Sequence, residues 1–230
     1  MANVDVMDLQ LKNRVVLVVG GTGLIGSAVA QRASDEGATV VIASRSGDGV
    51  VMDARDDDSV REAVEQVLSA HGRLDAVVIA AAPSARTLDP TKNDDPAQVA
   101  EAFDGKTLTF LRVANAVIPH MREAGYGRIV GVSGQNAFIT GNLTGSIRNA
   151  ALIIAAKNLA DELAGTGVTV TTVSPGIVSD HPATEVEPGR GGESSPDQIA
   201  DLVTFLISPR AVVSGESIAV GHRVLGAVSF

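Results

Sequence analysis

The segment RVVLVVGGTGLIGSAV at 14–29 constrains the fold more than any other part of the chain. Its first part, 14–20, is a short run of β-branched residues, as expected of a strand that is buried on both faces. Four glycines follow: Gly20, Gly21, Gly23 and Gly26. A helical pattern then begins at Leu24. A buried strand that turns tightly into a helix predicts the first unit of a β-α series.

The rest of the chain repeats this alternation of strand-length apolar runs and helix-period segments. We expect further strands at 39–44, 49–53, 75–81, 127–133, 168–174 and 217–220. We expect helices at 24–36, 59–72, 96–123, 142–164 and 196–207. The second helix has a capping-box pattern at Ser59 and Glu62. This order predicts an α/β fold, a single doubly wound parallel-sheet (Rossmann-type) domain over 1–230 with three αβα layers.

One long irregular segment interrupts the pattern at 180–196. It follows the carboxyl end of a strand, which is where open α/β sheets place their ligands. We therefore expect this segment to be a mobile lid over a site, and a plain surface loop is the alternative.

Charge and composition restrict the partners of the chain. A formal net charge of −9 argues against nucleic acid and anionic membranes, because both need a basic surface. The sequence contains no run of about 18 apolar residues, so no transmembrane helix is expected. The first residues lack the pattern of a signal peptide. There is no cysteine, and His120 and His181 have no partner at metal-ligand spacing, so no metal site is expected. We expect a cytoplasmic enzyme or binding protein that acts on a small molecule.

The glycine-rich turn predicts a site for the phosphates of a nucleotide. Glycine allows backbone conformations that side chains forbid, and it lets a phosphate approach the amides at the start of the helix. A tight turn without a ligand is the alternative. The residues expected to contact a cofactor here are Gly20, Thr22, Gly23, Leu24, Ile25 and Gly26.

The end of the second strand predicts which dinucleotide binds. A carboxylate there would bind the adenosine ribose and select NAD, but this chain has Ser44, Arg45 and Ser46. Arg45 can form charge-assisted hydrogen bonds to a 2′-phosphate, each worth roughly 1.5–3 kcal/mol, which favours NADP(H). A solvated surface arginine is the alternative. Asp53, which ends the third strand, is placed to accept a hydrogen bond from the adenine amino group.

Several motifs occur together in a characteristic order. They are GGTGLIG at 20–26, ASRS at 43–46, Asp53, DAVV at 75–78, IPHM at 118–121, GRIV at 127–130, SPG at 174–176 and SPDQIADLVTFLIS at 195–208. On these motifs the chain resembles the short-chain dehydrogenase/reductase family over nearly its whole length. The resemblance implies an oxidoreductase that uses NAD(P). It also implies cofactor contacts at Ala54, Ala80, Ala81, Pro175, Gly176 and Ile177.

The same resemblance shows other residues at the family's catalytic positions. Family members use a Ser and a Tyr that bind the substrate oxygen. A Lys four residues after the Tyr lowers its pKa, and an Asn on the preceding helix supports a proton relay. These positions fall on Gly134, Gly145, Asn149 and Lys106. A Thr that contacts the cofactor falls on Asp180, whose charge would repel a nearby pyrophosphate.

The polar residues left near this site are the candidates for any remaining chemistry: Lys106, Ser133, Gln135 and Asn149. Lys106 shares a helix face with Phe103 and Phe110, so it could point inward and have a lowered pKa. It could equally point outward or bind vacant carbonyl groups. Ser133 and Gln135 could contact a ligand or be plain polar residues at a strand end, and Asn149 has no titratable proton.

Three functions stay open. The first is an NADP(H)-dependent oxidoreductase whose proton comes from Lys106, a water or the substrate. The second is a catalytically silent dinucleotide-binding protein, a sensor or a partner subunit. The third is a lyase, isomerase or cyclase that uses the same pocket.

The segment 149–156 is apolar on nearly every face, so it should be covered on both sides. The family pairs two such helices across a dimer axis. We therefore expect a homodimer or homotetramer formed through the 142–164 helix.

Overall fold

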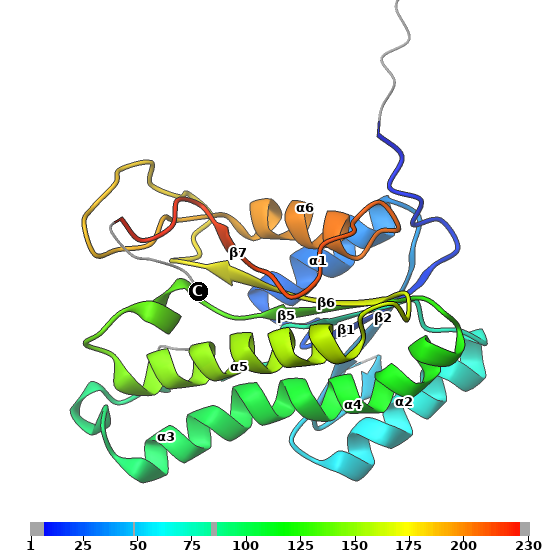
Figure 1. The fold of residues 1–230 in the computed structure, drawn as a ribbon, viewed down its shortest axis with the longest axis horizontal. Helices are drawn as coiled ribbons and strands as arrows, with labels where there is room; N and C mark the ends of the chain where they lie inside the picture. Colours follow the sequence, from blue (N-terminus) through cyan, green and yellow to red (C-terminus); the bar gives the residue numbers. More distant parts are fainter. Residues whose placement is uncertain (1–6, 48, 84–86, 226–230) are drawn as a thin grey trace, which may run out of the picture.

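A seven-stranded parallel sheet forms the middle layer of the molecule (Figure 1). The structure is a computed structural model and describes residues 7–47, 49–83 and 87–225. The strand order is β3-β2-β1-β4-β5-β6-β7. The strands are β1 (Val15–Val19), β2 (Thr39–Ser44), β3 (Val50–Val51), β4 (Ala76–Ile79), β5 (Gly127–Val132), β6 (Val168–Pro175) and β7 (Ser217–Val220). The order reverses between β1 and β4, so the predicted doubly wound fold is confirmed.

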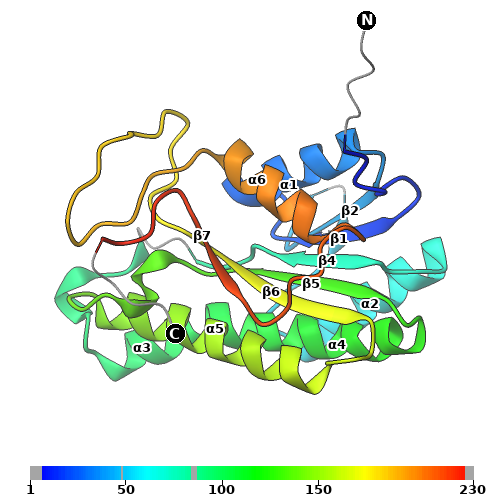
Figure 2. The same cartoon turned by 45° about the horizontal axis from the view of Figure 1, so that its top comes forward.

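Helices cover both faces of this sheet (Figures 1 and 2). One face carries α1 (Leu24–Asp35) and α6 (Pro196–Leu206). The other carries α2 (Asp57–His71), α3 (Pro96–Phe103), α4 (Thr109–Glu123) and α5 (Leu143–Glu162). Within the described residues no helix is long and apolar enough to cross a bilayer.

Burial on both faces explains why β1 is apolar throughout. Val16 and Val18 join the core under α1 and α6, whereas Leu17 and Val19 join the core under α2, α4 and α5. Successive side chains of a strand point to opposite faces, so a strand inside a three-layer fold needs an apolar residue at every position.

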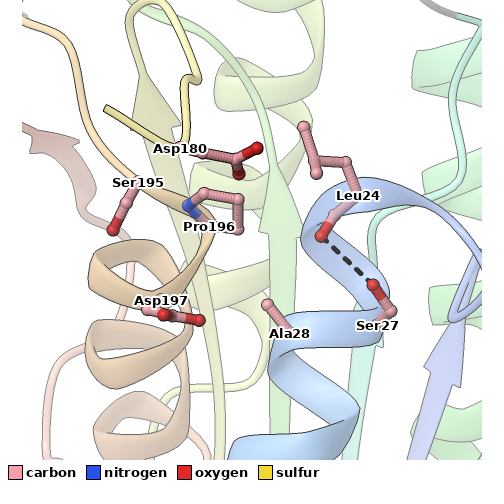
Figure 3. A pocket seen from close by; sticks show the side chains of 7 residues that line it. All are labelled: Leu24, Ser27, Ala28, Asp180, Ser195, Pro196 and Asp197. Carbon is pink, nitrogen blue, oxygen red and sulfur yellow. Dashed lines mark hydrogen bonds between the residues drawn. The ribbon is translucent and has the colours of Figure 1, made fainter. Parts of the chain in front are cut away.

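The amino ends of α1 and α6 lie at the carboxyl edge of the sheet. Leu24 of α1 and Pro196 of α6 line the same cavity there (Figure 3). The Ser195 hydroxyl accepts a hydrogen bond from the Gln198 amide, and the Gln198 side chain accepts one from the Ser195 amide. This capping box fixes where α6 begins.

The capping box predicted for α2 at Ser59 is wrong. Helix α2 begins at Asp57, and the carboxylate of Asp56 accepts a hydrogen bond from the Ser59 amide at 2.8 Å. The Ser59 hydroxyl instead accepts from the Asp53 amide at 2.9 Å. Asp and Ser are comparable N-cap residues, so propensity alone does not choose between them.

The long helix predicted for 96–123 is present but contains a π-helical turn. Residues Asp104–Leu108 form this turn between α3 and α4. The Asp104 carboxylate accepts hydrogen bonds from Arg55 Nε at 2.7 Å and from Arg112 Nη2 at 2.9 Å. Single π-helical turns often occur at functional sites, and this one carries Lys106.

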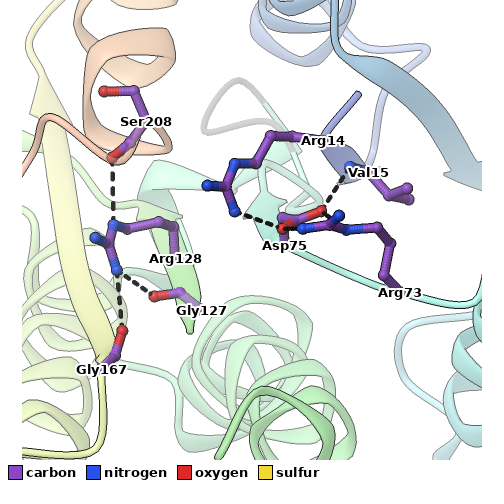
Figure 4. A network of polar contacts seen from close by, with 8 residues as sticks. All are labelled: Arg14, Val15, Arg73, Asp75, Gly127, Arg128, Gly167 and Ser208. Carbon is purple, nitrogen blue, oxygen red and sulfur yellow. Dashed lines mark hydrogen bonds and ion pairs between the residues drawn. The ribbon is translucent and has the colours of Figure 1, made fainter. Parts of the chain in front are cut away.

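A buried carboxylate ties together the amino edge of the sheet (Figure 4). Asp75, whose side chain is 4% exposed, accepts hydrogen bonds from Arg14 Nη1 at 2.8 Å, Arg73 Nε at 2.7 Å and the Val15 amide at 2.9 Å. Burial alone would raise the pKa of Asp75, but these hydrogen bonds outweigh it and lower the pKa below its usual value.

Replacing this carboxylate should destabilise the fold in a pH-dependent way. We expect Asp75→Asn to lower the free energy of unfolding at pH 7 by about 1–3 kcal/mol, because the arginines lose their charged acceptor. Since the folded-state pKa of Asp75 is lowered, its stabilisation is present above the unfolded pKa of about 3.9 and disappears as the pH falls through the folded pKa. Urea unfolding of the variant and of the unmodified protein, between pH 7 and pH 3, measures this difference in the free energy of unfolding.

The control for that measurement is Asp58→Asn. Asp58 is exposed and pairs with Arg61 one helical turn away. An exposed pair contributes little, so this variant should unfold like the unmodified protein. An Asp75→Asn variant as stable as the control at pH 7 would contradict the assignment.

Candidate functional site

The turn between β1 and α1 is packed too closely to accept a side chain at Gly20 or at Gly26. Gly20 has φ +81°, and a Cβ on it would lie 2.7 Å from the Ala81 amide nitrogen. A Cβ on Gly26 would lie 2.2 Å from the Gly20 carbonyl oxygen. The first residue before α1, Gly23, provides no side-chain cap. The free N–H groups at the amino end of α1 are therefore available to an anion at the carboxyl edge of the sheet.

Residues at the ends of β2 and β3 lie next to one another beside this turn. Ser44 pairs with Val51, so Arg45 and Asp53 emerge at the same edge. Arg45 is exposed and forms no hydrogen bond or ion pair with the residues that the structure describes. Asp53 is also exposed, and its Oδ1 accepts from the Arg55 amide at 3.0 Å. A basic and an acidic side chain thus both face solvent at this edge.

The other positions expected to contact a cofactor also lie at strand ends. Ala80 follows β4 and donates its amide hydrogen bond to the Val19 carbonyl at 2.9 Å. Pro175 ends β6, and a Cβ on the next residue, Gly176, would lie 2.3 Å from the Gly192 carbonyl oxygen. The sequence-predicted positions that meet at this carboxyl edge are Ser44, Ser46, Ala54, Ala80, Ala81, Pro175, Gly176 and Ile177.

A cavity of about 370 Å³ opens between the amino ends of α1 and α6 (Figure 3). It is lined by Leu24, Ser27, Ala28, Asp180, Ser195, Pro196 and Asp197. The exposed carboxylate of Asp180 therefore shares a cavity with the first turn of α1. A negative charge is favourable at a helix amino end, and it competes there with any phosphate.

The segment predicted to be a lid is fixed at its base. The Ser194 amide donates to the Ile177 carbonyl at 3.0 Å, and the Ser179 amide donates to the Ser194 carbonyl at 3.1 Å. The Gly192 amide donates to the His222 carbonyl at 2.7 Å. Between these points the chain arches away from the sheet edge (Figure 1). Movement of this arch over a ligand stays a prediction.

Lys106 is buried and points into the protein. Its residue is 7% exposed, and its Nζ donates a hydrogen bond to the Ser133 carbonyl at 3.1 Å. The sequence left open whether Lys106 points outward or binds a carbonyl group. The outward orientation is wrong, and the hydrogen bond to a carbonyl is confirmed. The Ser133 hydroxyl in turn donates to the Asn149 carbonyl at 3.1 Å. Ser133 thus links the π-helical turn to α5.

A second buried cation lies near Lys106. Arg148 on α5 is 4% exposed, and its Nη1 donates to the Pro83 carbonyl at 3.1 Å. Burial and the positive charge of Arg148 together lower the pKa of Lys106 to about 7. Arg148 is not among the site residues predicted from the sequence, although a lone arginine beside the apolar run of α5 is a signal that could have indicated it.

Two buried amide oxygens at this site have no hydrogen-bond donor among the described residues. Asn149 uses its Nδ2 to donate to the Gly145 carbonyl at 3.0 Å and to Asn136 Oδ1, and nothing in the described part of the chain donates to its own Oδ1. Gln135 donates from Nε2 to the Val220 carbonyl at 3.0 Å, and its Oε1, which lies against Gly191, accepts from no residue that the structure describes. A buried acceptor without a donor costs about 1–3 kcal/mol.

The arrangement matches a known family in sequence and in fold. A sequence profile described as Enoyl-(Acyl carrier protein) reductase matches residues 22–222. The chain belongs to the short-chain dehydrogenase/reductase family. The chain therefore belongs among the oxidoreductases of this family, whose FabG-like members depend on a nicotinamide dinucleotide.

Individual relatives align with this family member along most of its length. The 3-oxoacyl-(acyl-carrier-protein) reductase FabG of Aquifex aeolicus is 29% identical and covers 93% of this chain and 98% of its own. BbsC, a subunit of a hydroxy(phenyl)methylsuccinyl-CoA dehydrogenase of Thauera aromatica, is 32% identical over 90% of this chain and 92% of its own. The structure of a short chain dehydrogenase from Bacillus anthracis has a TM-score of 0.80 at 24% identity, covering 91% of this chain and 95% of its own, and supports the fold.

The pKa of Lys106 can be measured directly, because the chain has only four lysines: Lys12, Lys92, Lys106 and Lys157. NMR of protein labelled at lysine Cε should show one signal that titrates near pH 7, and Lys106→Arg should remove that signal. Lys157 is the control, since it also donates to a carbonyl, that of Gly215 at 2.7 Å. A Lys106 signal that titrates near the ordinary value of about 10.4 would refute the burial argument.

Proposed function

We propose that this chain binds NADP(H) and reduces a carbonyl group, or oxidises the corresponding alcohol, with Lys106 as the proton donor. The observation that carries the proposal is the buried amine of Lys106, which donates to the Ser133 carbonyl just after β5 and whose pKa burial lowers to about 7. A general acid works best when its pKa lies near the working pH. Lys106 occupies the family position of the relay asparagine, and the tyrosine position is Gly145.

The residues at the carboxyl edge fit the phosphates and ribose of a dinucleotide. Gly20 and Gly26 carry no side chain where the turn packs against the backbone beside the amino end of α1, and Gly23 provides no side-chain cap to the amides there. Arg45 is free to pair with a 2′-phosphate, which favours NADP(H) over NAD(H). Asn149 stands at the position of the family's lysine, and its Oδ1, to which no described residue donates, can accept from a ribose hydroxyl. Asp180 opposes the phosphates and must turn away from them.

The proton transfer follows from the charge of Lys106. Bound NADPH would supply the hydride for the carbonyl carbon. The carbonyl oxygen then carries a negative charge and takes a proton from the Nζ ammonium, which leaves a neutral amine that regains its proton from water. Burial lowers the pKa of Lys106 to about 7, so the ammonium can give up its proton at neutral pH, and a placed acid contributes roughly 10²–10⁴-fold to the rate.

A catalytically silent dinucleotide-binding protein is the second candidate, and one observation favours it. The space beside Gly145 is taken by neighbouring amides, since a Cβ there would lie 2.6 Å from Asn136 Nδ2 and 2.7 Å from Asn142 Nδ2. A substrate oxygen bound as in the family would have to displace these side chains. Binding of NADPH without any turnover would support this candidate.

We also propose that α5 pairs with α5 of a second copy of the chain. Three large apolar side chains on this helix are exposed: Leu143, Ile147 and Ile154, at 43%, 40% and 53%. They lie at helical spacing along one stripe, and an exposed apolar stripe favours a protein partner. A second copy of α5 packed on this stripe would bury the side of the helix that faces away from the sheet.

The proposed proton donor can be tested by turnover with NADPH against aldehydes, ketones and quinones. We expect Lys106→Met and Lys106→Arg each to lower kcat by about 10²–10⁴-fold, because neither side chain gives up a proton at neutral pH. Their affinity for NADPH, measured by fluorescence, should be unchanged.

The matched control is Lys157→Met, which removes a lysine of α5 that also binds a carbonyl oxygen. This variant should retain full turnover. Full kcat in Lys106→Arg would instead show that water or the substrate supplies the proton.

A further inference from the structure

Lys106 and Arg148 form a pair of buried cations that no carboxylate of the described residues neutralises. Their residues are 7% and 4% exposed, and their charges are close enough that Arg148 lowers the pKa of Lys106. Within the described part of the chain both donate to main-chain carbonyls, those of Ser133 and Pro83, and no ion pair involves either of them. A nearby carboxylate would raise the pKa values of Lys106 and Arg148. Both pKa values are instead lowered, chiefly by burial.

Buried charges in proteins are normally paired, because removing an ion from water costs several kcal/mol. Lys106 can relieve this cost by losing its proton. Arg148 cannot, since a guanidinium stays charged throughout the pH range of proteins. The positive charge of Arg148 therefore persists in the site and attracts an anion.

The free edge of Arg148 indicates what kind of anion fits. Nη1 is occupied by the Pro83 carbonyl, whereas Nε is buried and has no hydrogen-bond partner among residues 7–47, 49–83 and 87–225. Nη2 also makes no hydrogen bond to any residue that the structure describes. The edge formed by Nε and Nη2 carries two parallel N–H donors, which match the two oxygens of a carboxylate.

The position of this pair relates it to the substrate. Lys106 donates to the carbonyl of Ser133, which follows β5. Arg148 donates to the carbonyl of Pro83, which lies in the loop after β4. β4 and β5 are neighbours in the sheet. Both cations thus lie at the carboxyl edge, on the side of β1 away from Arg45.

We propose that Arg148 binds a carboxylate of the substrate through its Nε–Nη2 edge, with Lys106 beside it, so that the substrates are oxo acids or the corresponding hydroxy acids. The identity of the substrates rests on the proposed function, whereas the binding of a carboxylate at Arg148 does not depend on it. A bound carboxylate favours the charged form of Lys106, so the substrate itself helps to keep the proton donor loaded.

The lysine-labelled protein tests this binding without any dinucleotide. We expect 3-oxobutanoate to shift the Lys106 signal saturably and to raise the pKa of Lys106 by about 1 unit or more. The neutral 3-oxobutanamide should leave the signal unchanged, and the Lys157 signal should respond to neither probe. Inorganic phosphate, added separately, distinguishes a carboxylate site from a general anion site.

Arg148→Met supplies the variant arm. Without ligand, this substitution should raise the pKa of Lys106, because a neighbouring positive charge is gone. With 3-oxobutanoate, the affinity should fall about tenfold to a hundredfold, as expected for the loss of a charge-assisted hydrogen bond. The backbone NMR spectrum verifies that the variant is folded, and the probe pair on the unmodified protein remains decisive if it is not.

Several results would overturn the proposal. One is the absence of a saturable Lys106 shift up to about 10 mM 3-oxobutanoate, beyond the millimolar range of Kd. Another is an equal response to the neutral amide, and a third is a response to phosphate alone. Any of these results leaves NADPH binding and turnover to be judged by their own assays, so the two proposals can fail separately.

Discussion

The close approach of the β1–α1 turn to the end of β4 is the constraint on which the site depends. Gly20 lies against the backbone of Ala81, and Gly26 lies against the Gly20 carbonyl, with no room for a Cβ at either glycine. This contact brings the amino end of α1 to the sheet edge where β2, β5 and β6 also end. A larger residue at Gly26 would push α1 away and remove the amides from that edge.

A second constraint is the balance of charge at the same edge. On one side Arg45 is free and exposed, so its charge costs little until a ligand arrives. On the other side Lys106 and Arg148 are buried, and no carboxylate in the described part of the chain pairs with them, which is costly unless a proton is lost or a ligand binds. Buried charges with perturbed pKa values are typical of functional sites.

The fold could be predicted from the sequence because its signals are local. Strand-length apolar runs alternate with helix-period segments along the chain, and the glycines after β1 mark a tight turn into a helix. This alternation is typical of a parallel sheet covered by helices. The site was only partly predictable. The burial of Lys106 depends on a π-helical turn held by Arg55 and Arg112, which no periodic pattern reveals. The neighbour Arg148 comes from another helix, and only the packed structure brings the two together.

Titration with NADPH and NADH, followed by fluorescence, tests the central claim most directly. If the dinucleotide phosphates rest on the amino end of α1 with the 2′-phosphate at Arg45, NADPH should bind about tenfold or more tightly than NADH. Arg45→Ala should abolish this preference and leave NADH binding unchanged. Failure of both dinucleotides to bind, or a preference for NADPH that survives in Arg45→Ala, would contradict the account.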